Sequence, residues 1–493
     1  MKEDDKVYFD LERKPLESER REKRKQIGRA IGRFFSYLFV LFTGVVLGYY
    51  LVSTLHPTYK PNLNNTIGEI EYLMKNIWLY SQQDGDLSSD LEERALHGMT
   101  TYDYDPYTQY MSSDEMKEFA SSINRDYVGI GVQYSSQTGV PIIVRVFKNS
   151  PAERAGMLAG DIIRSVDGIT MNDDNMEELV DMVRGESGTE VRIGVQRGSE
   201  FIELSIIREA ISSTVYAIKE DDYVYMEIDS FGESTAADIE SYLNDYEDIR
   251  KLIVDLRDDS GGYQTAVRDC LRLFIGSGKP YLRQIDAYGN EQVDYTGSGK
   301  TFENFDKIVI ITNANTASAA EVFALVMREE LDNVTLVGET TYGKGVIQTN
   351  HYLKDGGVLK LTSFFWYSPQ GTTIDDVGVD PDIEVFMPDI YYEYYYAMEN
   401  DETYEYDSVS EAVRISEVAL DYLDYDVKRC DGYFDESFGE ALEAFKQDNG
   451  LPVNQILDAE TFDAIVARAR YELSNNEQKD SQLMKAIEVL HEN

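Results

Sequence analysis

The chain has 493 residues, 42% of them hydrophobic, and this length and composition predict two to four domains with real cores. A net charge of −45 excludes a nucleic-acid-binding protein, because a phosphate backbone requires a basic surface; it is typical of a solvated acidic surface. Two cysteines in so long a chain exclude a disulfide framework. Cys270 lies in an apolar helical run and is predicted to be a buried free thiol.

The N-terminal end has the features of a membrane anchor. Residues 1–33 are charged and include a strongly basic cluster at 20–25, and residues 34–52 follow without any charge. This second run is long enough to span a bilayer as a helix. The basic flank should stay in the cytoplasm, which places the rest of the chain outside as a single-pass protein of the cell membrane. A cleaved signal peptide and a buried soluble helix are the alternatives; a long basic region without an A-x-A site before His56 favours an uncleaved anchor.

Residues 62–122 are predicted to be helical, because apolar residues recur at helical spacing from Ile67 to Ile77. Residues 123–208 contain glycine-rich runs at 127–133, 149–156 and 159–168 that resemble a PDZ domain, a small β-barrel-like module. The resemblance implies a peptide-binding loop, in which successive backbone N–H groups hold a C-terminal carboxylate while the peptide adds to the sheet edge. The loop residues are Val128, Gly129, Ile130, Gly131 and Val132. The alternative is a glycine-turned hairpin with no ligand.

Residues 209–388 alternate strand-like and helix-like runs, which predicts an α/β core. The expected strands are 217–228, 251–256 and 307–311, and the expected helices are 236–243 and 264–274. Gly261 and Gly262 fall between a strand and a helix. Their N–H groups, with that of Ala319, can form an oxyanion hole; a plain strand-to-helix turn is the alternative.

The segment 312–348 holds the strongest chemical signal. Ser318 lies in an alanine-rich turn before a predicted helix at 320–330, and a short strand at 334–337 leads to Gly343-Lys344-Gly345. A serine hydroxyl needs an adjacent base, and a lysine can be that base if burial lowers its pKa. The two can meet if the helix and strand fold back as a pair. Gly338, Gly343 and Lys344 have the spacing of a phosphate-binding P-loop, but the Ser or Thr that would bind magnesium is replaced by Gly345 and a strand follows.

Several blocks in this region resemble, in order, those of the C-terminal processing (tail-specific) serine peptidases. They are Asp255-Leu-Arg-Asp-Asp-Ser-Gly-Gly262, Thr316-Ala-Ser-Ala-Ala-Glu321, Gly338-Glu-Thr-Thr-Tyr-Gly-Lys-Gly-Val-Ile-Gln348, Trp366-Tyr-Ser-Pro-Gln-Gly371 and Gly378-Val-Asp-Pro-Asp382. The resemblance implies a crotonase-like α/β core with Ser318 as nucleophile, Lys344 as general base and Gln348 as the residue that orients the lysine. It implies no metal and no organic cofactor, and it makes residues 62–122 a candidate surface for a homodimer.

The sequence departs from the family pattern at three places. Ala320 stands where a second serine is frequent, Asp259 stands where asparagine is frequent, and the serine-to-lysine spacing is one residue longer, which we place in the turn 330–333. None of these changes removes a proposed catalytic group. The Asp259 change adds a charge near the site.

The C-terminal third begins with a run rich in Tyr, Glu and Asp at 389–407, interpreted as a linker or a loosely docked segment. The alternative is that its tyrosines cover the surface of the core. Residues 408–470 form a small helical unit that resembles the three-helix peptidoglycan-binding repeat, with Asn454-Gln455 in place of the usual Asp-Gly. Contact with the cell wall and packing on the peptidase are both open roles for this unit. Residues 471–493 are interpreted as a polar helical tail.

Together these features predict a membrane-anchored serine endopeptidase, acting outside the cytoplasm, whose PDZ domain captures the C-terminal tails of protein substrates. One rival is a catalytically silent scaffold that binds tails or cell wall. Another is a different hydrolase or an acyl-CoA enzyme on the same core, since fold alone does not settle chemistry.

Overall fold

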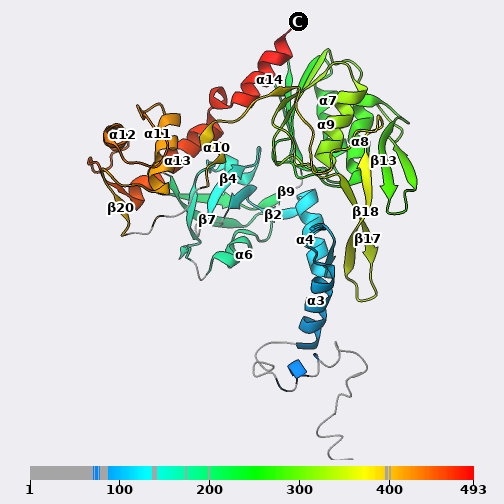
Figure 1. Ribbon diagram of the computed structural model, residues 1–493, viewed down its shortest axis with the longest axis horizontal. Helices are drawn as coiled ribbons and strands as arrows, with labels where there is room; N and C mark the ends of the chain where they lie inside the picture. The colour runs from blue at the N-terminus through cyan, green and yellow to red at the C-terminus, as the bar shows by residue number, and fades with distance from the viewer. Residues whose placement is uncertain are drawn as a thin grey trace, which may run out of the picture. The chain divides into compact units, whose positions relative to one another are not determined.

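The computed structural model describes residues 70, 73–75, 77, 87–135, 141–172, 175–197, 200–211, 213–394, 398 and 401–492. The chain divides into two compact units, residues 1–96 and 97–493. The described residues of the first unit are mostly helical and include the start of α3 (Leu87–Thr100). The elements discussed below belong to the second unit (Figure 1).

No helix among the described residues is long and apolar enough to cross a membrane. The predicted anchor at 34–52 and the basic segment 1–33 lie outside the described residues.

A β-rich domain follows helix α4 (Ser113–Asn124), with strand order β3-β4-β5-β7-β8 and β6 beside β5. Its strands are β3 (Val132–Ser135), β4 (Ile142–Val146), β5 (Ile162–Val166), β6 (Ile169–Thr170), β7 (Glu190–Arg197) and β8 (Glu200–Ile207). Its helices are α5 (Pro151–Arg154), η1 (Met176–Glu178) and α6 (Leu179–Val183). Apolar side chains of β4, β5 and β7 pack together in the buried core of this domain, while β3 is the edge strand. β2 (Tyr127–Gly129) pairs with β9 (Glu209–Ile211), so the chain enters and leaves this domain side by side.

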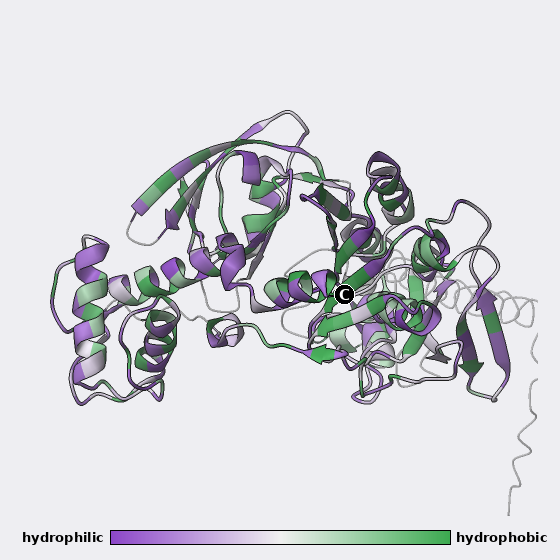
Figure 2. Ribbon diagram, turned by 90° about the horizontal axis from the view of Figure 1, so that it is seen from above, coloured by the Kyte–Doolittle hydropathy of each residue, from purple (hydrophilic) through white to green (hydrophobic). Residues whose placement is uncertain are grey.

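The largest core is built on a six-stranded sheet of order β10-β11-β12-β15-β16-β19, parallel from β11 onward. The strands are β10 (Val215–Lys219), β11 (Val224–Ile228), β12 (Lys251–Asp255), β15 (Lys307–Thr312), β16 (Val334–Gly338) and β19 (Ile383–Glu384). The central strands are continuous apolar runs because helices cover both faces; Figure 2 shows hydrophobic residues in these strands. Three helices cover one face, α7 (Thr235–Asp245), α8 (Gln264–Ile275) and α9 (Ala319–Glu330). The α/β prediction is confirmed, and the strand expected at 217–228 is two strands joined by a turn.

The other face of this sheet is covered by the C-terminal helix α14 (Ser481–His491). Leu483, Ala486 and Leu490 pack against Ile253 and Val309 of the strands. The interpretation of residues 471–493 as a polar helical tail is correct for the helix and wrong for its polarity, because the apolar face of α14 recurs every three or four residues and packs on the sheet.

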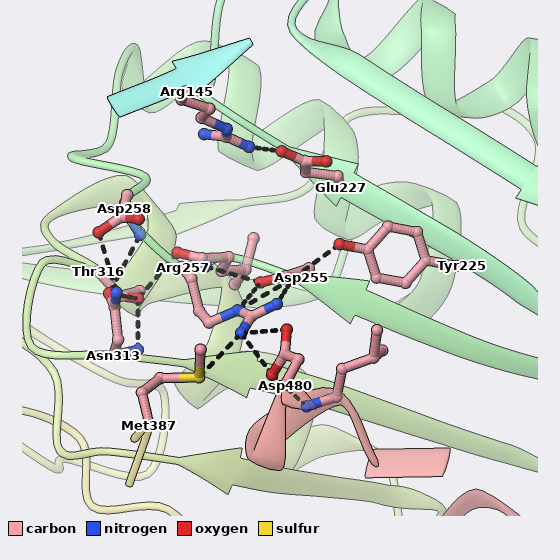
Figure 3. A network of polar contacts seen from close by, with 12 residues as sticks. Arg145, Tyr225, Glu227, Asp255, Arg257, Asp258, Asn313, Thr316, Met387 and Asp480 are labelled. Atoms are coloured by element: carbon pink, nitrogen blue, oxygen red, sulfur yellow. Dashed lines mark hydrogen bonds and ion pairs between the residues drawn. The ribbon is translucent and has the colours of Figure 1, made fainter. Parts of the chain in front are cut away.

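A partly buried ion-pair network ties the start of α14 to the core (Figure 3). The Arg257 guanidinium contacts the Asp255 carboxylate at 2.6 Å and the Asp480 carboxylate at 2.8 Å. Asp480 also caps α14, because its side chain accepts a hydrogen bond from the N–H of Leu483 at 2.9 Å. The Tyr225 hydroxyl donates to Asp255 at 2.8 Å and completes the network.

A second sheet, with order β1-β18-β13-β14 and β17 beside β18, lies next to the core. Its strands are β1 (Gln109–Met111), β13 (Pro280–Asp286), β14 (Glu291–Tyr295), β17 (Val346–Tyr352) and β18 (Val358–Tyr367). The prediction that residues 62–122 are helical holds for α3 and α4 and is wrong for β1, which pairs with β18 more than 240 residues later.

The small C-terminal domain contains α11 (Glu411–Tyr422), α12 (Glu436–Asp448) and α13 (Ala459–Asn475), with β20 (Thr403–Tyr404) paired to β21 (Leu457–Asp458). Its core also takes up Ile390, from helix α10 (Asp389–Tyr392), and Met398. The run 389–407 therefore packs against the C-terminal domain through Ile390 and Met398. η2 (Glu477–Lys479) connects this domain to α14. Both cysteines are free, and Cys270 is buried as predicted.

Candidate active site

Ser318 lies in the turn between β15 and α9, at the wall of a cavity of about 700 Å³. Its backbone has φ 56° and ψ −114°, outside the regions that L-residues favour. Such a conformation costs on the order of 1–3 kcal/mol and persists only when its surroundings hold it. Here the N–H of Ala317 donates to the Asp259 carbonyl at 2.9 Å, and the N–H of Val322 donates to the Ser318 carbonyl at 3.0 Å.

Lys344 lines the same cavity from the loop between β16 and β17. Its Nζ lies 4.6 Å from the centre of the Tyr107 ring, and no described residue accepts a hydrogen bond from it. Burial, followed by the nearby positive charge of Lys360, lowers the pKa of Lys344 to about 8, while Glu321 opposes this shift. The amine therefore loses its proton much closer to neutral pH than an exposed lysine does, and its neutral form is the one that a general base requires.

The buried carboxylate of Glu321 joins the serine turn to the lysine loop. Oε2 accepts the N–H of Ser318 at 2.7 Å and the N–H of Lys344 at 2.9 Å. Oε1 accepts the N–H of Gly343 at 2.7 Å and the hydroxyl of Thr341 at 2.5 Å. Four donors on one carboxylate fix the relative position of the two segments that carry the hydroxyl and the amine.

The glycine pair packs directly against the serine turn. Gly261 has φ 105°, and a Cβ at this position would lie 2.9 Å from both the Cβ of Ser318 and the N of Ala319. Only glycine permits this close approach.

The donors available to an oxyanion can be told apart at this turn. The N–H of Gly261 is already bound to Oδ1 of Asp259 at 2.8 Å. Among the described residues, the N–H groups of Gly262 and Ala319 have no acceptor, and both residues line the cavity. The Gly261 carbonyl accepts from the N–H of Phe231 at 3.0 Å, so the Gly262 N–H in the same trans peptide points away from Phe231.

Three regions of the chain match known protein families. The profile of peptidase family S41 matches residues 222–385, a PDZ domain profile matches 142–197, and a peptidoglycan binding domain profile matches 409–465. The carboxy-terminal processing protease CtpA of Bacillus subtilis is 33% identical over 416 residues, which cover 83% of this chain and 87% of that protein. The chain belongs to peptidase family S41.

Two further proteins are similar to this S41 peptidase. The carboxy-terminal processing protease CtpB of Bacillus subtilis is 31% identical over 414 residues, covering 82% of this chain and 85% of that protein. Among solved structures, a photosystem II D1 C-terminal processing protease matches with a TM-score of 0.42 and 21% identity, covering 64% of this chain and 88% of that one.

The residues predicted for the active site of the S41 peptidase come together at one cavity. Ser318, Ala319, Lys344 and Gln348 line it together with both glycines of the pair. Gln348 has its one described side-chain hydrogen bond with the Thr362 hydroxyl, at 3.4 Å. Its predicted contact with the lysine is therefore not made in this conformation.

The cavity continues into the PDZ domain. Gly129, Ile130, Gly131 and Val132 of the predicted peptide-binding loop line it, together with residues of the edge strand β3 and helix α6. Val128 does not line the cavity; its backbone pairs with Ala210 in the β2–β9 ladder.

Sequence reasoning missed four residues that shape the lysine environment. Glu321 was part of a quoted motif, but its spacing does not show that its carboxylate reaches the lysine loop. Trp366 donates its indole N–H to the Lys344 carbonyl at 2.8 Å, and Lys360 supplies the second positive charge. Tyr107 comes from a segment more than 200 residues away and has no sequence signal that links it to this site.

Proposed function

We propose that the chain is a membrane-anchored, extracytoplasmic serine endopeptidase that recognises the C-terminal tails of protein substrates and cleaves them with Ser318 and Lys344. The observation that carries this proposal is the single cavity lined by the serine, the lysine and the PDZ loop. A tail bound at the edge of β3 and α6 has a continuous path to the nucleophile.

In the proposed reaction, neutral Lys344 takes the proton of Ser318 as the hydroxyl attacks the scissile carbonyl. The N–H groups of Ala319 and Gly262 stabilise the negative oxygen of the tetrahedral intermediate. Lys344 then gives the proton to the leaving amine, an acyl-enzyme forms at Ser318, and water hydrolyses it. Gln348 would orient the lysine after a rotation of its side chain.

The anchor and the C-terminal domain are proposed on sequence grounds. The uncharged run 34–52 with its basic flank supports a single-pass topology, and the match at 409–465 supports contact with cell-wall peptidoglycan. Retention of the full-length chain in membranes after alkaline carbonate washing tests the anchor. Sedimentation with purified peptidoglycan tests the wall contact.

The peptidase test uses the full-length chain in mild detergent, alongside Ser318→Ala and Lys344→Ala. Each is incubated with an unfolded protein that ends in an apolar tail, and cleavage is followed by mass spectrometry. Cleavage by the wild type alone supports the proposal. Tight tail binding without cleavage by any form would favour the silent scaffold, and turnover of a thioester without peptide cleavage would favour an acyl-CoA enzyme.

A further inference from the structure

Asp259 lies at the junction of the glycine pair and the serine turn and is fully buried, with 0% of its surface exposed. Oδ1 of its carboxyl accepts the N–H of Gly261 at 2.8 Å, and its backbone carbonyl accepts the N–H of Ala317 at 2.9 Å. One residue therefore holds both segments that carry the proposed oxyanion donors.

The second carboxyl oxygen, Oδ2, is buried and has no hydrogen-bond partner among the described residues. An ionised carboxylate accepts hydrogen bonds on both oxygens, and a buried ion that lacks them is far more costly than a buried neutral acid. The surroundings of Oδ2 therefore favour the protonated form.

The charged groups around Asp259 come from three other elements. Asp229 follows β11, Arg125 caps α4, and Arg145 lies on β4; the thiol of Cys270 on α8 is also near. Burial raises the pKa of Asp259 well above its ordinary range, and the negative charge of Asp229 raises it further. The hydrogen bond from Gly261 and the two arginines oppose this shift without reversing it.

We propose that Asp259 is a positioning residue of the peptidase that supports the reaction only as a neutral acid. Its Oδ1 holds the N–H of Gly261, in the Ser260–Gly261 peptide, and so fixes the start of the glycine turn whose next N–H group, that of Gly262, is the proposed oxyanion donor. Its proton keeps a negative charge away from the place where the oxyanion forms. Ionisation of Asp259 would put the negative charge of its carboxylate near the negative charge that develops on the oxyanion, in a buried site. The rate would therefore fall.

The test compares wild type with Asp259→Asn, which keeps an acceptor for Gly261 but cannot ionise. The proposal rests on the proposed peptidase activity, so kcat for a tailed peptide is measured from pH 6 to pH 10. The ratio of kcat for the variant to kcat for wild type should rise with pH as Asp259 ionises, by about tenfold for each pH unit above its folded pKa. A matched control is Asp114→Asn. This exposed carboxylate pairs with Lys117 at 2.7 Å, which lowers its pKa, so its ratio should stay flat. A flat ratio for the Asp259 variant overturns the proposal.

A second measurement does not depend on activity. In the inactive Ser318→Ala chain, urea unfolding is followed from pH 4.5 to pH 8 with and without Asp259→Asn. A folded pKa above the unfolded one means that the folded state holds a proton that the unfolded chain releases. The stability contributed by this group is therefore greatest at low pH and is lost as pH rises toward the folded pKa. The urea midpoint of the chain with Asp259 should fall relative to the Asn chain as pH rises.

The pH profile of kcat and the urea midpoints distinguish a failure of the proposed peptidase activity from a failure of the neutral-acid proposal for Asp259. Equal pH dependence of the two midpoints overturns the neutral acid, even in an active peptidase. If no form cleaves any substrate while the midpoints diverge, the proposed function fails and the neutral state of Asp259 is upheld.

Discussion

Replacing Glu321 by glutamine tests how strongly the serine turn is coupled to the lysine loop. Each carboxylate oxygen accepts two hydrogen bonds. Three of the four donors are backbone N–H groups, and the fourth is the buried hydroxyl of Thr341. A glutamine offers one oxygen, so in either orientation two donors lose their acceptor and face an NH₂ group. At about 1–3 kcal/mol for each buried group left unsatisfied, the cost is roughly 2–6 kcal/mol.

That cost appears in one of two observables. If the fold holds the two segments in place, the free energy of unfolding falls by this amount, which urea denaturation measures. If the segments separate to relieve the contacts, kcat/KM falls instead, by about 100-fold for a displacement near 1 Å. Glu330→Gln is the matched control, since this carboxylate is exposed at the end of the same helix. The coupling would be refuted if Glu321→Gln matched the control in both measurements.

Three further outcomes are expected. Activity should rise with pH through about 8, the pKa of Lys344. Only about 9% of the lysine is neutral at pH 7 but roughly half at pH 8, and a kcat/KM that is flat from pH 6 to 9 would exclude this lysine as the base. Lys360→Gln removes the second positive charge and should move the acid limb of the same profile to higher pH, whereas a limb at an unchanged pH would show that burial alone sets this pKa. Asp480→Asn should lower the free energy of unfolding by about 1–3 kcal/mol, because Arg257 loses one of its two carboxylates; an unchanged urea midpoint would show that the pair with Asp255 suffices.

The order of elements around Ser318 could be predicted because it depends on local pattern. Apolar strands, a strand-to-helix turn and glycines around a lysine occupy adjacent stretches, and helix α9, strand β16 and strand β17 all appear where expected. The serine, the lysine and both glycines reach one cavity for the same reason: parallel strands bring their C-terminal ends to one edge of the sheet.

The parts that could not be predicted depend on contacts between distant segments. β1 joins β18, and Tyr107 covers the Lys344 amine, through pairings that leave no periodic trace in either segment. The acidic run after residue 389 concealed the burial of Ile390 and Met398. The docking of α14 is the exception, since Leu483, Ala486 and Leu490 have a helical apolar spacing that predicts a buried face.

The position of α14 has a consequence for how the fold is completed. Ile253, Val309 and Val337 line a sheet face that residues 483–490 cover. Domains generally fold in the order of synthesis, yet a complete helical domain separates the last strand of this sheet from the helix that covers it. A chain shortened at residue 480 would leave an apolar sheet face open to water. The core is thus not closed when its own strands have been made, because its closure requires a helix that is synthesised after another domain.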